Sequence, residues 1–162
     1  MIRSNVFILS LILTCSFISV QAQSPFRSAL IGKKVSETPL SEYIQQDIHG
    51  DQLILLIAYG CSHCQKATQK ALRLRNTSSI DNFIVLGSEA EETNTKAEFM
   101  ATIADEDIKV IDYEWTTFPR KFTIPEPGFP NPPVIFYVQN NVIMNIMTDV
   151  PDKANYKKSA GK

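Results

Sequence analysis

The chain has 162 residues, a formal net charge of −1, 44% hydrophobic residues and 20% charged residues. This composition is enough to bury the core of one domain and excludes a disordered polymer, and the balanced charge excludes the basic surface of a nucleic-acid-binding protein. It also excludes the collagen-like, cysteine-dense and multi-pass membrane classes.

The first element in chain order is a predicted signal peptide over residues 1–22. Arg3 is followed by an apolar run over 6–20, and Ala22 ends a short segment typical of a cleavage site. The run is shorter than the roughly 20 apolar residues that cross a bilayer, so a retained anchor is disfavoured. Lipidation at Cys15 is a second interpretation. Both predict an exported protein, periplasmic or extracellular, that associates with a membrane only if it is lipidated or anchored.

The rest of the chain predicts one α/β domain over residues 23–150 and a polar tail over 151–162. A Pro at position 39 begins a short helix over 39–47. The first half of the domain then contains a βαβ unit, made of an apolar strand over 53–59, a helix over 62–75 that lacks Pro and Gly, and an apolar strand over 83–86.

The second half is more irregular. We expect an exposed helix over 89–105 that turns Ala97, Met100, Ala101 and Ala104 inward, and then a short strand over 108–111. A Pro-rich stretch over 113–133 follows, where Trp115, Phe118 and Phe122 either form a satellite core or line a substrate rim. Asn140-Asn141 suits a tight turn with positive φ between strands over 134–138 and 142–147.

The sequence Cys61-Ser62-His63-Cys64 carries the chemistry. It closes the junction between a buried strand and a helix, where free backbone N–H groups and the helix dipole stabilise the Cys61 thiolate. Cys64, one helical turn later, is placed to attack a mixed disulfide formed at Cys61. His63 adds a further group that stabilises the thiolate, which favours the reduced dithiol and makes the disulfide more oxidising.

Three other interpretations of the two cysteines are less favoured. A structural disulfide across two residues closes almost no loop and removes little entropy from the unfolded chain. A zinc site lacks a second Cys pair, which leaves His49, His63 and scattered carboxylates to complete it. Copper handling would use the soft ligands Met144 and Met147, which are more simply core residues of a strand. Dithiol–disulfide chemistry is favoured.

The strand over 53–59, Gly60, the Cys-x-x-Cys and the following helix resemble the thioredoxin superfamily. The βαβ unit and the final strand-turn-strand match the two halves of that fold, a central mixed sheet flanked by helices with the Cys-x-x-Cys at a helix N-terminus. Among subgroups the chain resembles exported thioredoxin-like proteins, with the His of the DsbA-type motif. The helix and strand over 89–112 are similar to the insertion of TlpA- and ResA-like proteins.

The resemblance implies an exported thiol–disulfide oxidoreductase that acts on protein or peptide thiols and disulfides. Cys61 would be the nucleophile, Cys64 the resolving thiol and His63 the tuning residue. An unidentified partner would recycle the protein, and no cofactor is implied, because the dithiol is itself the redox centre. The alternative is a copper chaperone, or a redox-gated binding module, on the same fold.

The resemblance also implies a cis-proline facing the cysteines. The candidates are Pro132 and Pro133, and the spacing to the following strand favours Pro133. In the family the preceding residue pairs its backbone with the substrate, but Pro132 has no N–H to donate. We expect three residues to contact the substrate, Pro133, Pro132 and Tyr59.

The chain departs from the family at three positions near the cysteines. Ser62 replaces a common Pro, and Gly60 replaces the aromatic residue that often precedes the first Cys. Leu55 replaces a buried acid that helps to deprotonate the second Cys. Without that acid, the Cys64 proton must pass to His63, water or the substrate, and burial raises the pKa of Cys64.

Overall fold

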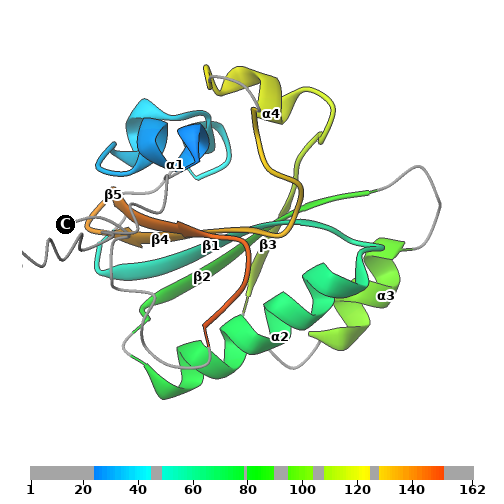
Figure 1. Cartoon of the computed structure of the whole chain (residues 1–162). Coiled ribbons are helices and arrows are strands. Elements are labelled where there is room, and N and C mark those ends of the chain that lie inside the picture. The colour runs from blue at the N-terminus through cyan, green and yellow to red at the C-terminus, as the bar shows by residue number, and fades with distance from the viewer. Residues whose placement is uncertain are drawn as a thin grey trace, which may run out of the picture.

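The computed structural model describes residues 24–44, 49–78, 80–89, 95–103, 108–124 and 128–151. The predicted signal peptide and all of the tail except residue 151 lie outside these ranges. A five-stranded mixed sheet, in the order β3-β2-β1-β4-β5, forms the centre of the molecule (Figure 1). Its strands are β1 (Asp51–Ala58), β2 (Asn82–Ser88), β3 (Lys109–Asp112), β4 (Val134–Gln139) and β5 (Val142–Met147).

Strand β1 lies in the middle of the sheet, as its continuous apolar sequence predicts. It runs parallel to β2, with Leu53 opposite Phe83, and antiparallel to β4, with Leu53 opposite Tyr137. Successive side chains of a strand point to opposite faces, so β1 supplies both cores. Ile54 and Leu56 join the core on one face, whereas the core on the other face takes Leu53, Leu55 and Ile57.

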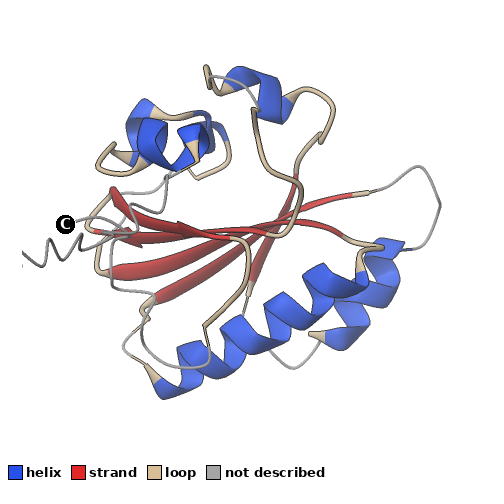
Figure 2. Cartoon of the chain, viewed as in Figure 1, coloured by secondary structure: helices blue, strands red, loops and turns tan. Residues whose placement is uncertain are grey.

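Two helices cover the face that holds Leu55 (Figure 2). They are α2 (Ser62–Thr77) and α3 (Thr95–Thr102). Helix α2 is not interrupted by Pro or Gly. Six of its side chains are buried against the sheet, Cys64, Ala67, Thr68, Ala71, Leu72 and Leu74. The prediction of a helix over 62–75 is confirmed.

The predicted inner face of α3 was wrong. Phe99 and Ile103 are buried, whereas Ala97, Met100 and Ala101 are exposed, and Ala104 lies outside the described residues. The predicted pattern followed the spacing of the small residues, whereas Phe99 and Ile103 lie on a different face of the helix. The larger apolar area of Phe99 instead decides which face turns to the core.

The opposite face is covered by short elements, α1 (Pro25–Leu30), the 3-10 helices η1 (Val35–Glu37) and η2 (Pro39–Glu42), and α4 (Phe118–Lys121). The expected helix over 39–47 is therefore only a 3-10 turn, and residues 45–48 lie outside the described ranges. Aromatic rings hold this layer together, with centroids 4.6 Å apart for Phe26 and Phe129 and 5.1 Å apart for Phe118 and Phe122. Phe118 and Phe122 are thus core residues.

The segment from Gly32 to Val35 pairs with the outer edge of β5. The Gly32 N–H donates to the Ile143 carbonyl at 2.8 Å, and the Ile143 N–H donates to the Lys33 carbonyl at 2.9 Å. The adjoining turn has φ values of 47° at Asn140 and 66° at Asn141, which confirms the positive φ predicted there.

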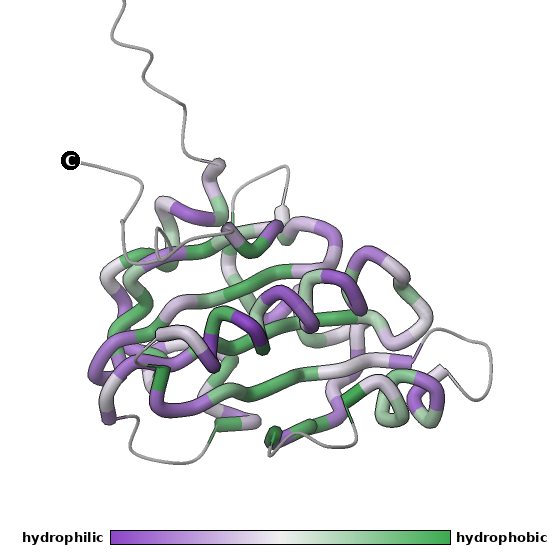
Figure 3. The backbone as a smooth tube through the Cα atoms, turned by 90° about the horizontal axis from the view of Figure 1, so that it is seen from below, coloured by the Kyte–Doolittle hydropathy of each residue, from purple (hydrophilic) through white to green (hydrophobic). Residues whose placement is uncertain are grey.

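A βαβ unit and a β-hairpin therefore share one sheet, the arrangement that the resemblance implied, and the fold is thioredoxin-like. Figure 3 shows hydrophobic residues along the central strands and an alternation of hydrophobic and hydrophilic residues along α2. None of the helices in the described ranges is long and apolar enough to cross a membrane.

Candidate active site

Cys61 is the N-cap of α2, at the point where the chain leaves β1. Its backbone is extended, with φ −85° and ψ 109°, and its Sγ accepts a hydrogen bond from the Cys64 N–H at 3.1 Å. That N–H is one of the donors that a helix start leaves without a backbone partner. A sulfur at this position faces the positive end of the helix dipole, which stabilises a thiolate over a thiol.

Cys64 has the opposite surroundings. Cys61 is partly exposed, whereas Cys64 is completely buried in the core between α2 and the sheet. Burial raises the pKa of the Cys64 thiol to about 12, and the hydrogen bond with Cys61 adds to the rise. Leu55, which replaces the family's buried acid, belongs to the same apolar core.

Ser62 and His63 occupy the first turn of α2 between the cysteines. Both side chains are exposed. The imidazole therefore lies at the same water-facing end of the helix as the accessible sulfur of Cys61. The tuning role of His63 stays a prediction.

Gly60 leads into the cysteines, and the structure explains the lack of an aromatic side chain there. A Cβ at this position would lie 3.1 Å from Cγ2 of Thr95, at the start of α3. A bulky side chain would have to displace that helix start. The departure of Gly60 from the family pattern thus accompanies the close packing of α3 beside the cysteines.

Tyr59, which the sequence predicts to bind substrate, is a buried residue. Only 1% of the residue is exposed. Its ring fills the space over Gly87, where a Cβ would come within 2.1 Å of Cζ, and its hydroxyl donates to Oδ1 of Asp112 at 2.6 Å. These contacts make Tyr59 a support for the backbone that leads to Cys61.

Asp112 anchors this support. Its Oδ2 accepts from Nζ of Lys96 at 2.5 Å, and that nitrogen lies 5.9 Å from the centroid of the Tyr59 ring. Partial burial acts to raise the pKa of Asp112, but the hydrogen bonds from Lys96 and Tyr59 outweigh it and lower the pKa. The chain before Cys61 is therefore tied to both β3 and α3.

The peptide bond between Pro132 and Pro133 is cis. Pro133 is buried and Pro132 is partly exposed. Val134 pairs with Leu56 of β1, so the two prolines enter the sheet at the end of β1 from which Cys61 follows. The structure brings the prolines and the cysteines to one end of the sheet.

The sequence did not identify a set of polar residues beside this site. Ser88, Asp112 and Tyr113 follow or end β2 and β3, and Lys96 joins them from α3. The carboxyl ends of neighbouring parallel strands are where α/β folds commonly place their ligands, which is the pattern that points to these residues.

The described residues contain no group of three or more His, Cys, Asp or Glu side chains that could hold a metal ion. Met144 and Met147, the candidate copper ligands, pack at the margin of the core that contains Leu53 and Cys64. No observation in the described ranges favours the copper alternative.

The sequence matches no protein-family model and no curated protein. Three solved structures are similar to the chain. A secreted disulfide oxidoreductase of Mycobacterium tuberculosis, described as homologous to E. coli DsbE, has a TM-score of 0.45 and 7% identity over 62% of this chain and 70% of that chain. A thiol:disulfide interchange protein of the thioredoxin family from Chlorobium tepidum TLS has a TM-score of 0.48 and 15% identity over 67% and 75%.

The third structure is reduced Prx3 from Vibrio vulnificus, with a TM-score of 0.46 and 10% identity over 76% of this chain and 88% of that chain. Likeness at this level does not transfer an activity. The assignment of the fold rests on the strand order and pairing described above. The chain has a thioredoxin-like fold in which a Cys-x-x-Cys begins the helix that follows the central strand.

Proposed function

We propose that the protein is an exported thiol–disulfide oxidoreductase that exchanges disulfides with protein or peptide thiols. The observation that carries this proposal is the contrast between the two cysteines. Cys61 is a partly exposed residue whose sulfur accepts a helix N–H, and Cys64, one turn later, is buried. The export rests on the predicted signal peptide alone.

The exchange takes two steps. The Cys61 thiolate attacks a substrate disulfide, forms a mixed disulfide and releases one substrate thiolate. Cys64 then loses its proton and attacks the Cys61 sulfur, which forms the Cys61–Cys64 disulfide and releases the second substrate thiolate. The protein dithiol is oxidised by two electrons and the substrate disulfide is reduced by two, and the reverse sequence oxidises a substrate.

The second step is where this chain differs from its family. Leu55 offers no carboxylate to accept the Cys64 proton, and burial holds the pKa of that thiol at about 12. We assign the proton to water, to His63 or to the departing substrate thiolate, all of which reach the site from its exposed side. Resolution is then slower than attack, and the mixed disulfide has time to accumulate.

The roles of the remaining site residues follow from their positions. His63 stabilises the Cys61 thiolate from the exposed first turn of α2. Pro133 and the Pro132 carbonyl, directly before the start of β4, contact the substrate peptide, and Tyr59 supports the chain before Cys61.

The test is insulin reduction by the mature chain, residues 23–162, in the presence of dithiothreitol. We expect turnover in the wild type and its loss in Cys64→Ala, which still forms the first mixed disulfide. No turnover in the wild type, together with no equilibration with glutathione, would overturn the oxidoreductase proposal.

The direction of electron flow is settled by the reduction potential. A value of roughly −120 to −180 mV marks a protein that donates or isomerises disulfides, whereas one near roughly −270 mV marks a reductant. Because His63 favours the reduced form, we expect the more oxidising value.

A further inference from the structure

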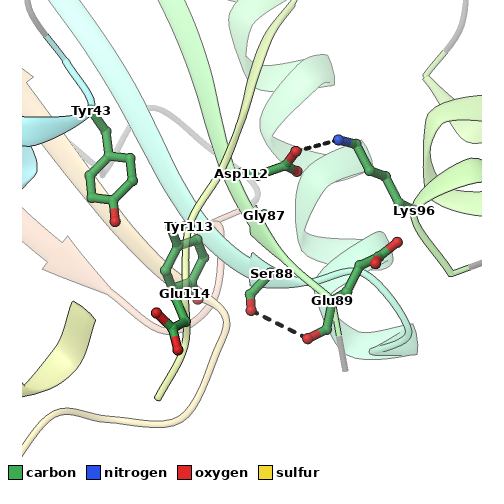
Figure 4. Close-up of a pocket in the computed structure, with 8 residues that line it drawn as sticks. All are labelled: Tyr43, Gly87, Ser88, Glu89, Lys96, Asp112, Tyr113 and Glu114. Atoms are coloured by element: carbon green, nitrogen blue, oxygen red, sulfur yellow. Dashed lines mark hydrogen bonds and ion pairs between the residues drawn. The ribbon is translucent and has the colours of Figure 1, made fainter. Parts of the chain in front are cut away.

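A pocket of about 540 Å³ opens at the carboxyl ends of β2 and β3 (Figure 4). This volume falls within the roughly 300–1,000 Å³ that is usual for small ligand sites. The pocket, here called the β2–β3 pocket, is lined by Tyr43, Gly87, Ser88, Glu89, Lys96, Asp112, Tyr113 and Glu114.

The charges of the β2–β3 pocket are mainly negative. Its one described cation, Lys96, is already bound to Asp112, which also accepts from Tyr59. Glu89 and Glu114 remain, and no described cation lies within ion-pair distance of either. Hydrogen bonds from Thr116 and Thr117 lower the pKa of Glu114, so its carboxylate is charged at neutral pH.

Tyr113 supplies an observation that is independent of the acids. The residue is only 6% exposed, lines the β2–β3 pocket, and its hydroxyl has no hydrogen-bond partner among the described residues. Burial raises the pKa of this phenol, so the group is neutral at physiological pH, and its oxygen can accept a hydrogen bond. Buried hydroxyls are normally paired, so an unpaired one in a pocket wall indicates that a ligand completes it.

The β2–β3 pocket lies next to the redox site. Ala58 of β1 pairs with Ser88, and the Tyr59 N–H donates to the Ser88 carbonyl at 3.0 Å. Neighbouring strands are about 4.8 Å apart, so the pocket begins one strand away from the chain that leads to Cys61. Pro133 lies on the other side of β1, because β4 is the opposite neighbour of that strand.

We propose that the β2–β3 pocket binds the ammonium or guanidinium group of a Lys or Arg close to the reactive cysteine of the substrate. Glu89 and Glu114 provide the negative charge, and the Tyr113 oxygen accepts a hydrogen bond from the cation. This inference rests on the proposed redox function and names its substrate class, a peptide with a basic residue beside its cysteine.

The test uses three peptides of the form acetyl-X-Cys-X-amide, with X as Lys, Ala or Glu, each as the mixed disulfide with thionitrobenzoate. Cys61 attacks the peptide sulfur and releases thionitrobenzoate, and Cys64 then closes the protein disulfide and releases the peptide thiolate. The release of thionitrobenzoate gives the second-order rate constant. We expect the Lys peptide to react about tenfold faster than the Ala peptide at low salt, and the Glu peptide more slowly than either.

The decisive variant is Glu89→Gln/Glu114→Gln, with Tyr113→Phe as a second. The double variant lowers the Lys-to-Ala rate ratio about fivefold, because two close charge contacts are lost. The control, Glu37→Gln/Asp81→Asn, removes the same charge at the opposite end of the sheet and leaves the ratio unchanged. Equal ratios in the wild type and the double variant, or an equal loss in the control, would overturn the proposal.

Two further measurements separate this proposal from the redox function. Reaction with uncharged hydroxyethyl disulfide reports thiol exchange alone and stays unchanged in the double variant. Acetyl-Lys-Ser-Lys-amide has no thiol, and it shifts the backbone amide resonances of Ser88 and Tyr113 in the wild type only. A protein that reduces hydroxyethyl disulfide but shows neither the Lys preference nor these shifts has the redox function without the basic specificity.

Discussion

The two ends of the first turn of α2 place the same side chain in opposite environments. Cys61 caps the helix, is partly exposed and accepts the N–H of Cys64, whereas Cys64 is completely buried beside aliphatic side chains. One sulfur is placed to react with molecules from solution, and the other only with its neighbour. The difference shows that the position of each cysteine in the fold, and not its residue type, determines its role.

The largest expected effect comes from removing each sulfur in turn. Cys61→Ser lowers disulfide exchange to background, a loss of at least about a thousandfold, because the group that enters the reaction is gone. Cys64→Ser instead leaves the attack intact and accumulates a mixed disulfide, which mass spectrometry detects. If Cys64→Ser abolished attack and Cys61→Ser did not, the assignment of the two roles would be reversed.

Alkylation of the reduced native protein sharpens the same contrast. At pH 7 iodoacetamide modifies Cys61 at least about a hundredfold faster than Cys64, because Cys64 is inaccessible and its thiol is protonated. The thiolate fraction of Cys64 rises tenfold per pH unit below its pKa of about 12, so any labelling of it rises about a hundredfold between pH 7 and 9. Peptide mapping after timed quenching gives both rates. Equal rates at pH 7 would contradict the burial of Cys64.

Gly87→Ala tests whether the packing of Tyr59, which supports the chain before Cys61, can be disturbed without exposing Cys64. The new Cβ would meet the Tyr59 ring at 2.1 Å, so overpacking destabilises the fold by about 1–3 kcal/mol. Urea unfolding measures the loss. We expect the alkylation rate of Cys61 to change while Cys64 stays protected, and Gly60→Ala, whose Cβ would lie 3.1 Å from Thr95, provides a milder comparison.

Asp112→Asn is the variant for which we expect the smallest change in stability. It weakens a largely exposed ion pair with Lys96, so the free energy of unfolding falls by no more than about 0.5 kcal/mol. The folded state lowers the pKa of Asp112 from 3.8, so the stabilisation is present above that value and is lost as the pH falls through the lower folded pKa. Unfolding curves at pH 7 and pH 3 therefore differ less for the variant than for the wild type. An equal pH dependence in both proteins would assign the acid sensitivity to other carboxylates.

The sequence predicted the parts of the fold whose pattern is local. Strand β1 has an uninterrupted apolar run, and α2 has neither Pro nor Gly, so their type and position followed directly. The inner face of α3 did not follow, because two different faces of this helix carry apolar residues, and Phe99 outweighs the small residues around it. The aromatic layer over the other face is made of segments distant in sequence, and no local pattern shows Phe26 against Phe129.

The site divides in the same way. The cysteines and the exposed His63 are adjacent in sequence, so their chemistry was visible from the start. Tyr59 was assigned to the substrate surface because it precedes Gly60, but its contact with Gly87 needs the pairing of β1 with β2. The β2–β3 pocket takes residues from four separate segments of the chain. The lack of a hydrogen-bond partner for the Tyr113 hydroxyl among the described residues can be seen only in the folded structure.

The pairing of the Gly32–Val35 segment with β5 joins parts of the chain that are more than a hundred positions apart. The Lys33 carbonyl and the Ile143 N–H form one of its hydrogen bonds. Contacts of such high sequence separation form late, because a long loop must close before they stabilise anything. A ribosome that has made the Cys-x-x-Cys helix but not β5 holds a chain whose sheet still has an open edge. The two cysteines are therefore synthesised well before the Gly32–Val35 segment can pair with β5.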